Sequence, residues 1–101
     1  MTTRARDPQT SHEADDICDA LQISHLQGWV IVRLHRFGAQ SDGELVTAHQ
    51  AAVSRDETNT RATPQRIRTA RKELELQGLV KFTGEYGRTP FNRRTQIWSI
   101  A

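Results

Sequence analysis

The sequence predicts a single α+β domain, mostly helical, that ends in a capped helix followed by a β-hairpin. The first observation behind this prediction is a segment at residues 63–77 with helix-start and helix-stop residues at its ends. The second is a pair of β-branched and aromatic runs after it, separated by turn-forming residues. The third is the helical spacing of apolar residues in the preceding segments. A chain of 101 residues has room for one small domain.

The N-terminal part of the sequence predicts a tail followed by a short helix. Residues 1–10 show no apolar periodicity, so we expect a disordered tail before a single domain that spans residues 11–101. Ser11 precedes several acidic residues, which predicts a short extra helix that continues to Leu21. Its apolar stripe is narrow, and residues 11–22 are the candidate helix for a homodimer, which stays an open alternative.

Two amphipathic segments predict the first two core helices. Residues 24–37 stop at Gly38 and have an apolar face that contains Leu26, Trp29, Val30, Ile31, Leu34 and Phe37. Ser41 and Glu44 have the S-x-x-E spacing of a capping box, which predicts a helix that continues through Val53. The polar segment that follows, residues 54–62, is then a turn of about nine residues, longer than the three or four of a classical helix-turn-helix.

The third core helix is predicted at residues 63–77. Thr63 can cap its first turn, Pro64 suits the first helical position, and Gly78 can close it in a left-handed conformation. A spacing of 100° per residue separates an inner face from an outer, polar face. The inner face contains Ile67, Ala70 and Leu74, the outer face Gln65, Arg68, Thr69 and Lys72, and the flanks Arg66 and Arg71.

A β-hairpin is predicted after this helix. Residues 79–83 and 95–100 are the expected strands, and the Gly-, Pro- and Asn-containing residues 84–94 are the expected tip, which we interpret as long and loose. The tip carries three arginines and two aromatic residues, namely Arg88, Arg93, Arg94, Tyr86 and Phe91.

The charge distribution places the cations in this C-terminal part. Residues 61–101 hold nine Lys or Arg and three Asp or Glu, whereas residues 1–60 hold five and nine. The formal net charge of +2 therefore hides a basic end and an acidic front. A basic patch on one helix and one hairpin is typical of a surface that faces a polyanion.

With these elements in place, TPQRIRTARKELELQGLV followed by RTPFNRRTQIWSI resembles the winged helix-turn-helix family of DNA-binding proteins, in particular its small single-domain members from bacteria and phages. The resemblance covers residues 24–101. It implies three core helices plus a C-terminal two-stranded hairpin, the wing. It also implies a cytoplasmic protein that acts in transcription regulation or in phage DNA transactions.

The resemblance implies that helix 63–77 enters the major groove of double-stranded DNA. Gln65 can then pair with adenine, Arg68 with guanine, and Thr69 can contact a thymine methyl group. The wing, residues 84–95, would contact the backbone or the minor groove. The DNA-binding residues expected from this arrangement are Arg61, Thr63, Gln65, Arg66, Arg68, Thr69, Arg71, Lys72, Arg88, Arg93 and Arg94.

An alternative is a winged helix used as a protein-interaction module. Leu76 lies almost opposite Ile67 on the helix, and Tyr86 and Phe91 are in the wing, so these three side chains are the candidate contacts for a host or transcription protein. A further alternative is that the polar outer face of helix 63–77 is only a solvent-exposed surface and binds no partner.

The sequence offers little support for other classes of protein. It shows no paired carboxylates, no Ser-His-Asp or Cys-His arrangement and no phosphate-binding Gly loop, so we expect no enzyme and no cofactor. His12, Cys18 and His49 lack zinc-site spacing, so we expect no metal. No apolar run approaches the length of a membrane span, and the N-terminal residues have no signal-peptide character, which favours an intracellular protein.

Overall fold

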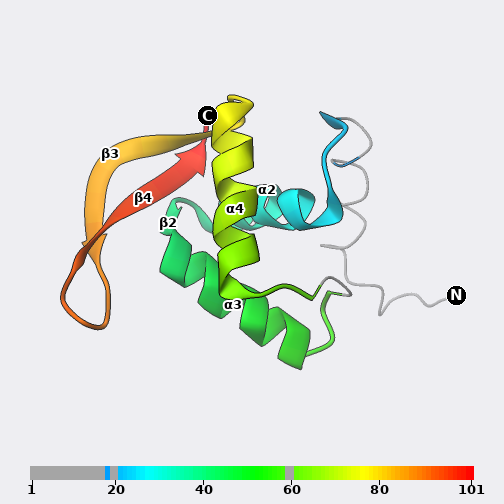
Figure 1. The fold of residues 1–101 in the computed structure, drawn as a ribbon, viewed down its shortest axis with the longest axis horizontal. Coiled ribbons are helices and arrows are strands. Elements are labelled where there is room, and N and C mark those ends of the chain that lie inside the picture. Colours follow the sequence, from blue (N-terminus) through cyan, green and yellow to red (C-terminus); the bar gives the residue numbers. More distant parts are fainter. Residues whose placement is uncertain (1–17, 19–20, 59–60) are drawn as a thin grey trace, which may run out of the picture.

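The structure is a computed structural model that describes residue 18 and residues 21–58 and 61–101. Its elements are α2 (His25–Phe37), β2 (Gln40–Ser41), α3 (Asp42–Ser54), α4 (Pro64–Leu76), β3 (Val80–Arg88) and β4 (Arg94–Ile100) (Figure 1). These three helices and one three-stranded antiparallel sheet confirm the α+β prediction. The expected tail at 1–10 and most of the expected acidic helix at 11–21 lie outside the described residues.

The helices α2 and α3 begin with the same local device, a serine capping box. The Ser24 hydroxyl accepts a hydrogen bond from the Gln27 backbone N–H at 3.1 Å, and the Ser24 N–H donates to Gln27 Oε1 at 2.9 Å. Ser41 and Glu44 repeat this arrangement at 3.1 and 2.9 Å, as their spacing predicts. Each box satisfies two backbone N–H donors that the first turn would otherwise leave unpaired.

The core lies between the three helices and the base of the hairpin. It is formed by Leu26, Trp29, Val30, Ile31, Leu34, Leu45, Ala52, Ile67, Ala70, Leu74, Val80 and Trp98. The expectation that Phe37 shares this apolar face is wrong, because its side chain is 62% exposed. Phe37 is the last residue of α2, and the Arg33 guanidinium lies 3.8 Å from the centre of its ring.

Both predicted ends of α4 are present. The Thr63 hydroxyl accepts a hydrogen bond from the Arg66 backbone N–H at 3.2 Å. At the other end Gly78 has a φ of +79°, which glycine adopts without steric cost. The Leu79 N–H then donates to the Leu74 carbonyl at 2.9 Å, the closing bond of a Schellman motif. The capping residues Thr63 and Gly78 therefore define the two ends of α4, as the sequence predicts.

The sheet contains one strand that the sequence did not predict. Gln40 pairs with Trp98 and Ser41 with Ile97, so that the short β2 lies beside β4 in the order β2-β4-β3. Two residues are too few to show a strand periodicity. The pairing ties the start of α3 to the base of the hairpin.

The hairpin is more regular than expected, and it bends. The register shifts between Phe82 and Tyr86, where Gly84 has a φ of +90°. Extra residues on one strand of a pair bend that strand and increase its twist. Figure 1 shows the result, a curved hairpin that extends to one side of the helices.

The long, loose tip predicted for residues 84–94 is also wrong. Strand pairing continues to Arg88 opposite Arg94, which leaves only residues 89–93 outside the strands. The cross-strand hydrogen bonds of the distal half outweigh the low strand preference of its glycines.

The helix α4 occupies the front of the molecule in the view of Figure 1. It packs against both α2 and α3, and it leads directly into the hairpin. No helix in the part of the chain that the structure describes is long and apolar enough to cross a membrane.

Candidate nucleic-acid interface

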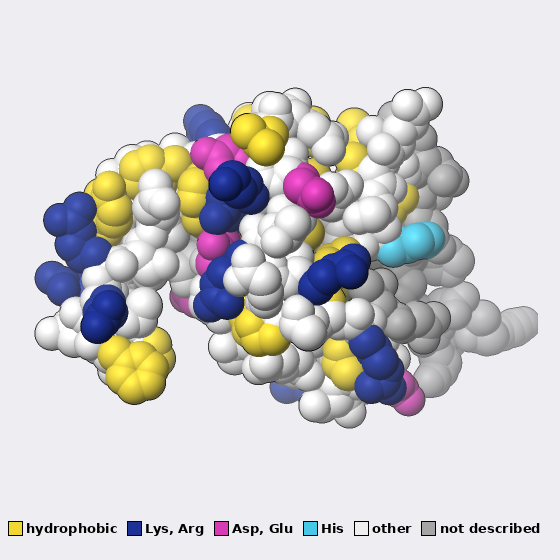
Figure 2. Space-filling view, viewed as in Figure 1, with side chains coloured by type: hydrophobic (Ala, Val, Ile, Leu, Met, Phe, Trp, Pro, Cys, Tyr) yellow, Lys and Arg dark blue, Asp and Glu magenta, His cyan; other side chains and the backbone are white. Residues whose placement is uncertain are grey.

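The outer face of α4 is polar, basic and exposed to solvent. Its inner face is the opposite, since Ile67, Ala70 and Leu74 are each at most 3% exposed. Exposed on the outer side are Gln65, Arg66, Arg68, Thr69 and Lys72, as the helical spacing predicts. Figure 2 shows Lys and Arg side chains along this helix.

The two acids of α4 are held by neighbouring side chains. Glu73 Oε1 accepts a hydrogen bond from Gln27 Nε2 at 2.8 Å. Glu75 Oε1 accepts one from Arg71 Nη1 at 2.9 Å. Both carboxylates lie in the second half of the helix, so the first two turns carry the unbalanced positive charge.

The first turn of α4 opposes its own helix dipole. It contains no acidic residue, and Arg66 occupies its third position. The first turn of α3, in contrast, holds Asp42 and Glu44. A cation near a helix N-terminus is unfavourable by about 0.3–1 kcal/mol, and an external anion would remove that penalty.

Arg71 departs from the predicted phosphate-binding set. Its Nε and Nη2 donate to the two carboxylate oxygens of Asp42 at 2.9 and 2.8 Å, and its guanidinium lies 3.8 Å from the ring centre of Trp98. A bidentate pair of this kind is among the stronger hydrogen-bonded contacts in proteins. Arg71 thus joins α4 to α3 and β4, and we do not include it in the candidate interface.

The distal hairpin carries a second group of cations. Arg88 and Arg94 are cross-strand partners, so two like charges lie directly opposite each other. Such a pair destabilises a hairpin unless an anion lies nearby. The Arg94 guanidinium lies 4.1 Å from the ring centre of Tyr86, so the side chains of Arg94 and Tyr86 share one face of the hairpin. The pairing therefore concentrates positive charge rather than neutralising it.

The remaining predicted residues lie at the ends of these two elements. Arg93 is exposed beside the hairpin tip, and Arg61 is exposed just before α4. Thr63 is exposed and caps α4. Figure 2 shows Lys and Arg side chains on both α4 and the hairpin from one side of the molecule. Lys and Arg side chains of the two elements are therefore visible from the same side of the molecule, while Arg71 is engaged with Asp42 and Glu75.

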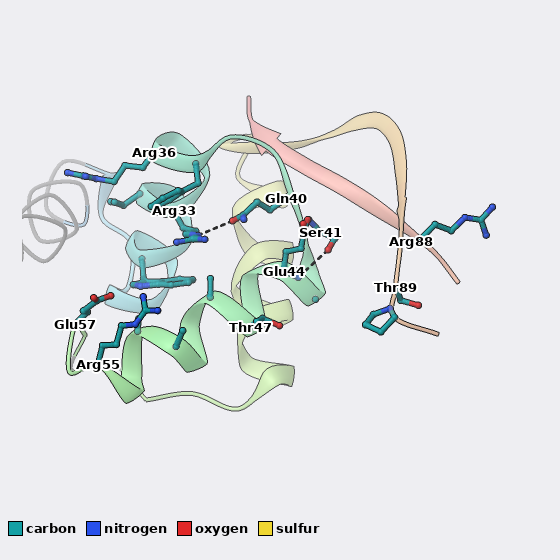
Figure 3. Close-up of a pocket in the computed structure, with 18 residues that line it drawn as sticks. Arg33, Arg36, Gln40, Ser41, Glu44, Thr47, Arg55, Glu57, Arg88 and Thr89 are labelled. Atoms are coloured by element: carbon teal, nitrogen blue, oxygen red, sulfur yellow. Dashed lines mark hydrogen bonds between the residues drawn. The ribbon is translucent and has the colours of Figure 1, made fainter. Parts of the chain in front are cut away.

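A groove that sequence reasoning missed lies between α2, α3 and the hairpin tip (Figure 3). Its volume is about 1270 Å³. Its lining on α3 includes Gly43, Thr47 and Ala51, which are small residues spaced four positions apart. That repeat of small residues was visible in the sequence, but the opposing wall comes from α2, which lies elsewhere in the chain.

The wall of the groove on α2 is a mixture of aromatic and charged groups. Arg33 Nε donates to Gln40 Oε1 at 3.1 Å, and Figure 3 shows Arg33 turned toward Gln40. Burial lowers the pKa of Arg33, while the nearby Glu44 and Glu57 oppose this shift. Arg88 borders the groove, but in Figure 3 it points away from α2 and α3. The local cations are thus partly balanced inside the groove itself.

The exposed apolar side chains do not form one patch. Leu76 is 78% exposed at the C-terminal end of α4, which lies beside the base of the hairpin, whereas Phe91 is 85% exposed at the tip. Figure 1 places these two ends of the hairpin far apart in the molecule. Tyr86 is half exposed and packs against Arg94 and Phe82.

Within the described ranges, no three His, Cys, Asp or Glu side chains form a group that could hold a metal ion.

No protein-family model, curated protein or solved structure matches this chain. The candidate site therefore rests on its own residues, their exposure and their charge.

Proposed function

We propose that this chain is a DNA-binding domain of the winged helix-turn-helix type that acts in transcription regulation or phage DNA transactions. One observation carries the proposal: exposed cations on α4 and on the hairpin lie on one face, while the two acids of α4 are engaged with Gln27 and Arg71. The succession of α2, α3 and α4 followed by a hairpin is the order that the family resemblance implies.

In this proposal α4 lies in the major groove. The side chains of Gln65, Arg68 and Thr69 project from its outer face and are free of the core. Their chemistry suits adenine, guanine and the thymine methyl group, respectively. Arg66 and Lys72 border this set and bind phosphates, which position the helix without reading sequence.

The hairpin acts as the wing beside α4. Its cations Arg88, Arg93 and Arg94 contact the backbone or the minor groove next to the segment that α4 occupies. An adjacent phosphate relieves the repulsion between the paired Arg88 and Arg94. The repulsion that is relieved in the complex therefore favours binding of the hairpin to a polyanion.

Salt dependence tests the proposal. If about six cations each neutralise one phosphate, the log-log dependence of the binding constant on salt has a slope of about −5. Fluorescence anisotropy with random-sequence 30-base-pair duplexes at several salt concentrations measures this slope. Failure of the chain to bind any duplex at low salt would contradict the proposal.

A matched pair of arginine variants locates the surface. Arg66→Ala removes a cation from α4 and should reduce the magnitude of the slope by about 0.9. Arg55→Ala removes the same kind of side chain from the groove lining just after α3 and should leave the slope unchanged. Equal effects of the two variants would place the bound DNA elsewhere.

A protein-interaction module is the second candidate, and the exposure of Phe91 and Leu76 favours it. Because these residues lie at opposite ends of the hairpin, a single small partner would use one of them. This reading requires that Phe91→Ala or Leu76→Ala abolish partner binding while Arg68→Ala and Arg93→Ala leave it intact. Loss of duplex binding in the arginine variants would instead support the first candidate.

A further inference from the structure

The hairpin tip is a closed turn built from few residues. The Asn92 N–H donates to the Thr89 carbonyl at 2.9 Å, and the Thr89 N–H donates to the Arg93 carbonyl at 2.8 Å. The Thr89 hydroxyl also accepts from the Arg93 N–H at 3.1 Å. Pro90 supplies a fixed φ, and Asn92 adopts the left-handed conformation at +60°. These bonds hold Phe91 at the apex.

Phe91 is the most exposed aromatic side chain among the described residues, at 85%. Other exposed rings are partly covered, since Arg33 stacks on Phe37 and Arg94 on Tyr86. Full burial of a phenylalanine side chain removes a large apolar area from water and thereby stabilises the folded chain or complex that buries it. This stabilisation is largely unused in the free chain and is available to a partner that encloses the ring.

The surroundings of Phe91 narrow the chemistry of that partner. Arg93 lies two residues away, and Arg88 is held close to the tip because its Nη1 donates to the Asn92 carbonyl at 3.2 Å. A partner must therefore offer a slot for an apolar ring between anionic groups. Duplex DNA has this combination, because phosphates line both sides of a minor groove about 6 Å wide and stacked bases form its floor.

On these grounds we propose that Phe91 is a wedge that enters the minor groove, partly unstacks one base step and kinks the duplex. Apolar side chains inserted in this way unstack a base step, and the free-energy cost of unstacking is smallest at flexible pyrimidine–purine steps. The ordered tip reduces the entropy lost on insertion. The chain therefore selects DNA with a deformable step beneath the wing. This inference rests on the proposed DNA-binding function.

Two duplexes of equal composition test the wedge. Each has a 20-base-pair centre between identical GC clamps and a donor and an acceptor dye at its ends. One centre alternates A and T, so a TA step recurs throughout, and the other is a dA·dT tract without pyrimidine–purine steps. We expect the wild-type chain to bind the alternating duplex about ten-fold more tightly and to raise its end-to-end energy transfer.

Four variants separate the wedge from the cations and the helix. Phe91→Ala should reduce the ten-fold preference to within about two-fold and remove the change in energy transfer, whereas Phe91→Leu should keep both. Arg93→Ala should weaken binding to both duplexes equally. Arg68→Ala should leave the preference intact, which excludes major-groove reading by α4 as its source. Because Phe91 is exposed, its replacement should not alter the unfolding midpoint.

The outcomes distinguish the wedge from the proposed function. If the wild-type chain binds both duplexes without a change in energy transfer, or if Phe91→Ala behaves as wild type, the wedge is overturned and DNA binding stands. If the wild-type chain binds neither duplex at low salt, the proposed function fails and the wedge fails with it.

Discussion

The two sides of α4 differ in what their side chains are available to do. On the inner side Ile67 and Leu74 are at most 1% exposed and form part of the core. On the outer side Arg68 and Thr69 are exposed. Because a buried side chain already has its contacts, the inner side sets the stability of the domain. The outer side is free to set its affinity for a partner.

Two arginines of this helix show that residue type does not decide whether a side chain is engaged inside the fold or exposed to solvent. Arg68 and Arg71 lie three positions apart, and both are candidates for phosphate binding by charge alone. The structure gives Arg71 a bidentate carboxylate from Asp42 and a ring from Trp98, while Arg68 remains exposed. The comparison teaches that a cation paired inside the fold contributes to stability, whereas an exposed cation is available to bind a partner.

The largest effect that would test this comparison is expected on the inner side. Leu74→Ala should lower the free energy of unfolding by about 3 kcal/mol, because Leu74 is fully buried in the hydrophobic core. Urea unfolding followed by the fluorescence of Trp29 and Trp98 measures this. A loss below about 1 kcal/mol would mean that the site can collapse around the cavity and that the core is less tightly packed than its burial indicates.

The next effect concerns Arg71. Arg71→Ala should destabilise the domain by about 2 kcal/mol, because it leaves a partly buried Asp42 carboxylate without its partner. Arg71→Lys should recover only part of the loss, since an ammonium group cannot make the bidentate contact. Unfolding of wild type, Arg71→Ala, Asp42→Ala and the double variant completes a double-mutant cycle and measures the coupling. If fully folded Arg71→Ala protein binds duplex DNA more weakly than wild type, Arg71 is part of the candidate interface after all.

A smaller free-energy effect, visible only in binding, is expected for Arg68. Arg68→Ala should weaken binding to a preferred duplex about ten-fold, within the range of one base contact, and should leave unfolding unchanged to about 0.5 kcal/mol. Anisotropy titrations against duplexes that differ at single G·C pairs measure whether discrimination at one position is relaxed. A uniform loss across all duplexes would assign Arg68 to phosphate instead of a base.

The smallest effect is expected at the start of the helix. Thr63→Ala should cost about 1 kcal/mol of stability through loss of the hydrogen bond from the Arg66 N–H, whereas Thr63→Ser should keep it. Thermal unfolding of the two variants checks this difference. Equal stability of the two would show that a backbone or solvent contact replaces the cap.

Local signals explain why much of this fold was predictable from the sequence. A cap requires a hydroxyl and a backbone N–H three residues away, so Ser41 and Thr63 were sufficient to place the starts of α3 and α4, whereas α2 was indicated by the helical spacing of its apolar residues. The left-handed turn at Gly78 is also local. The exposed set on α4 follows from helical spacing, because a face without apolar residues has no core contact to make.

The sequence by itself therefore determined the helices, the hairpin and the side of α4 that faces solvent. The tertiary structure alone decided that Arg71 pairs with Asp42, that Gln40 and Ser41 add a strand beside β4, and that α2 and α3 enclose a groove. Figure 2 also shows Lys and Arg side chains of the hairpin and of α4 from the same side of the molecule. The physical reason is that these features join residues distant in the chain, whose contacts depend on how complete elements pack and on a bend between Phe82 and Tyr86.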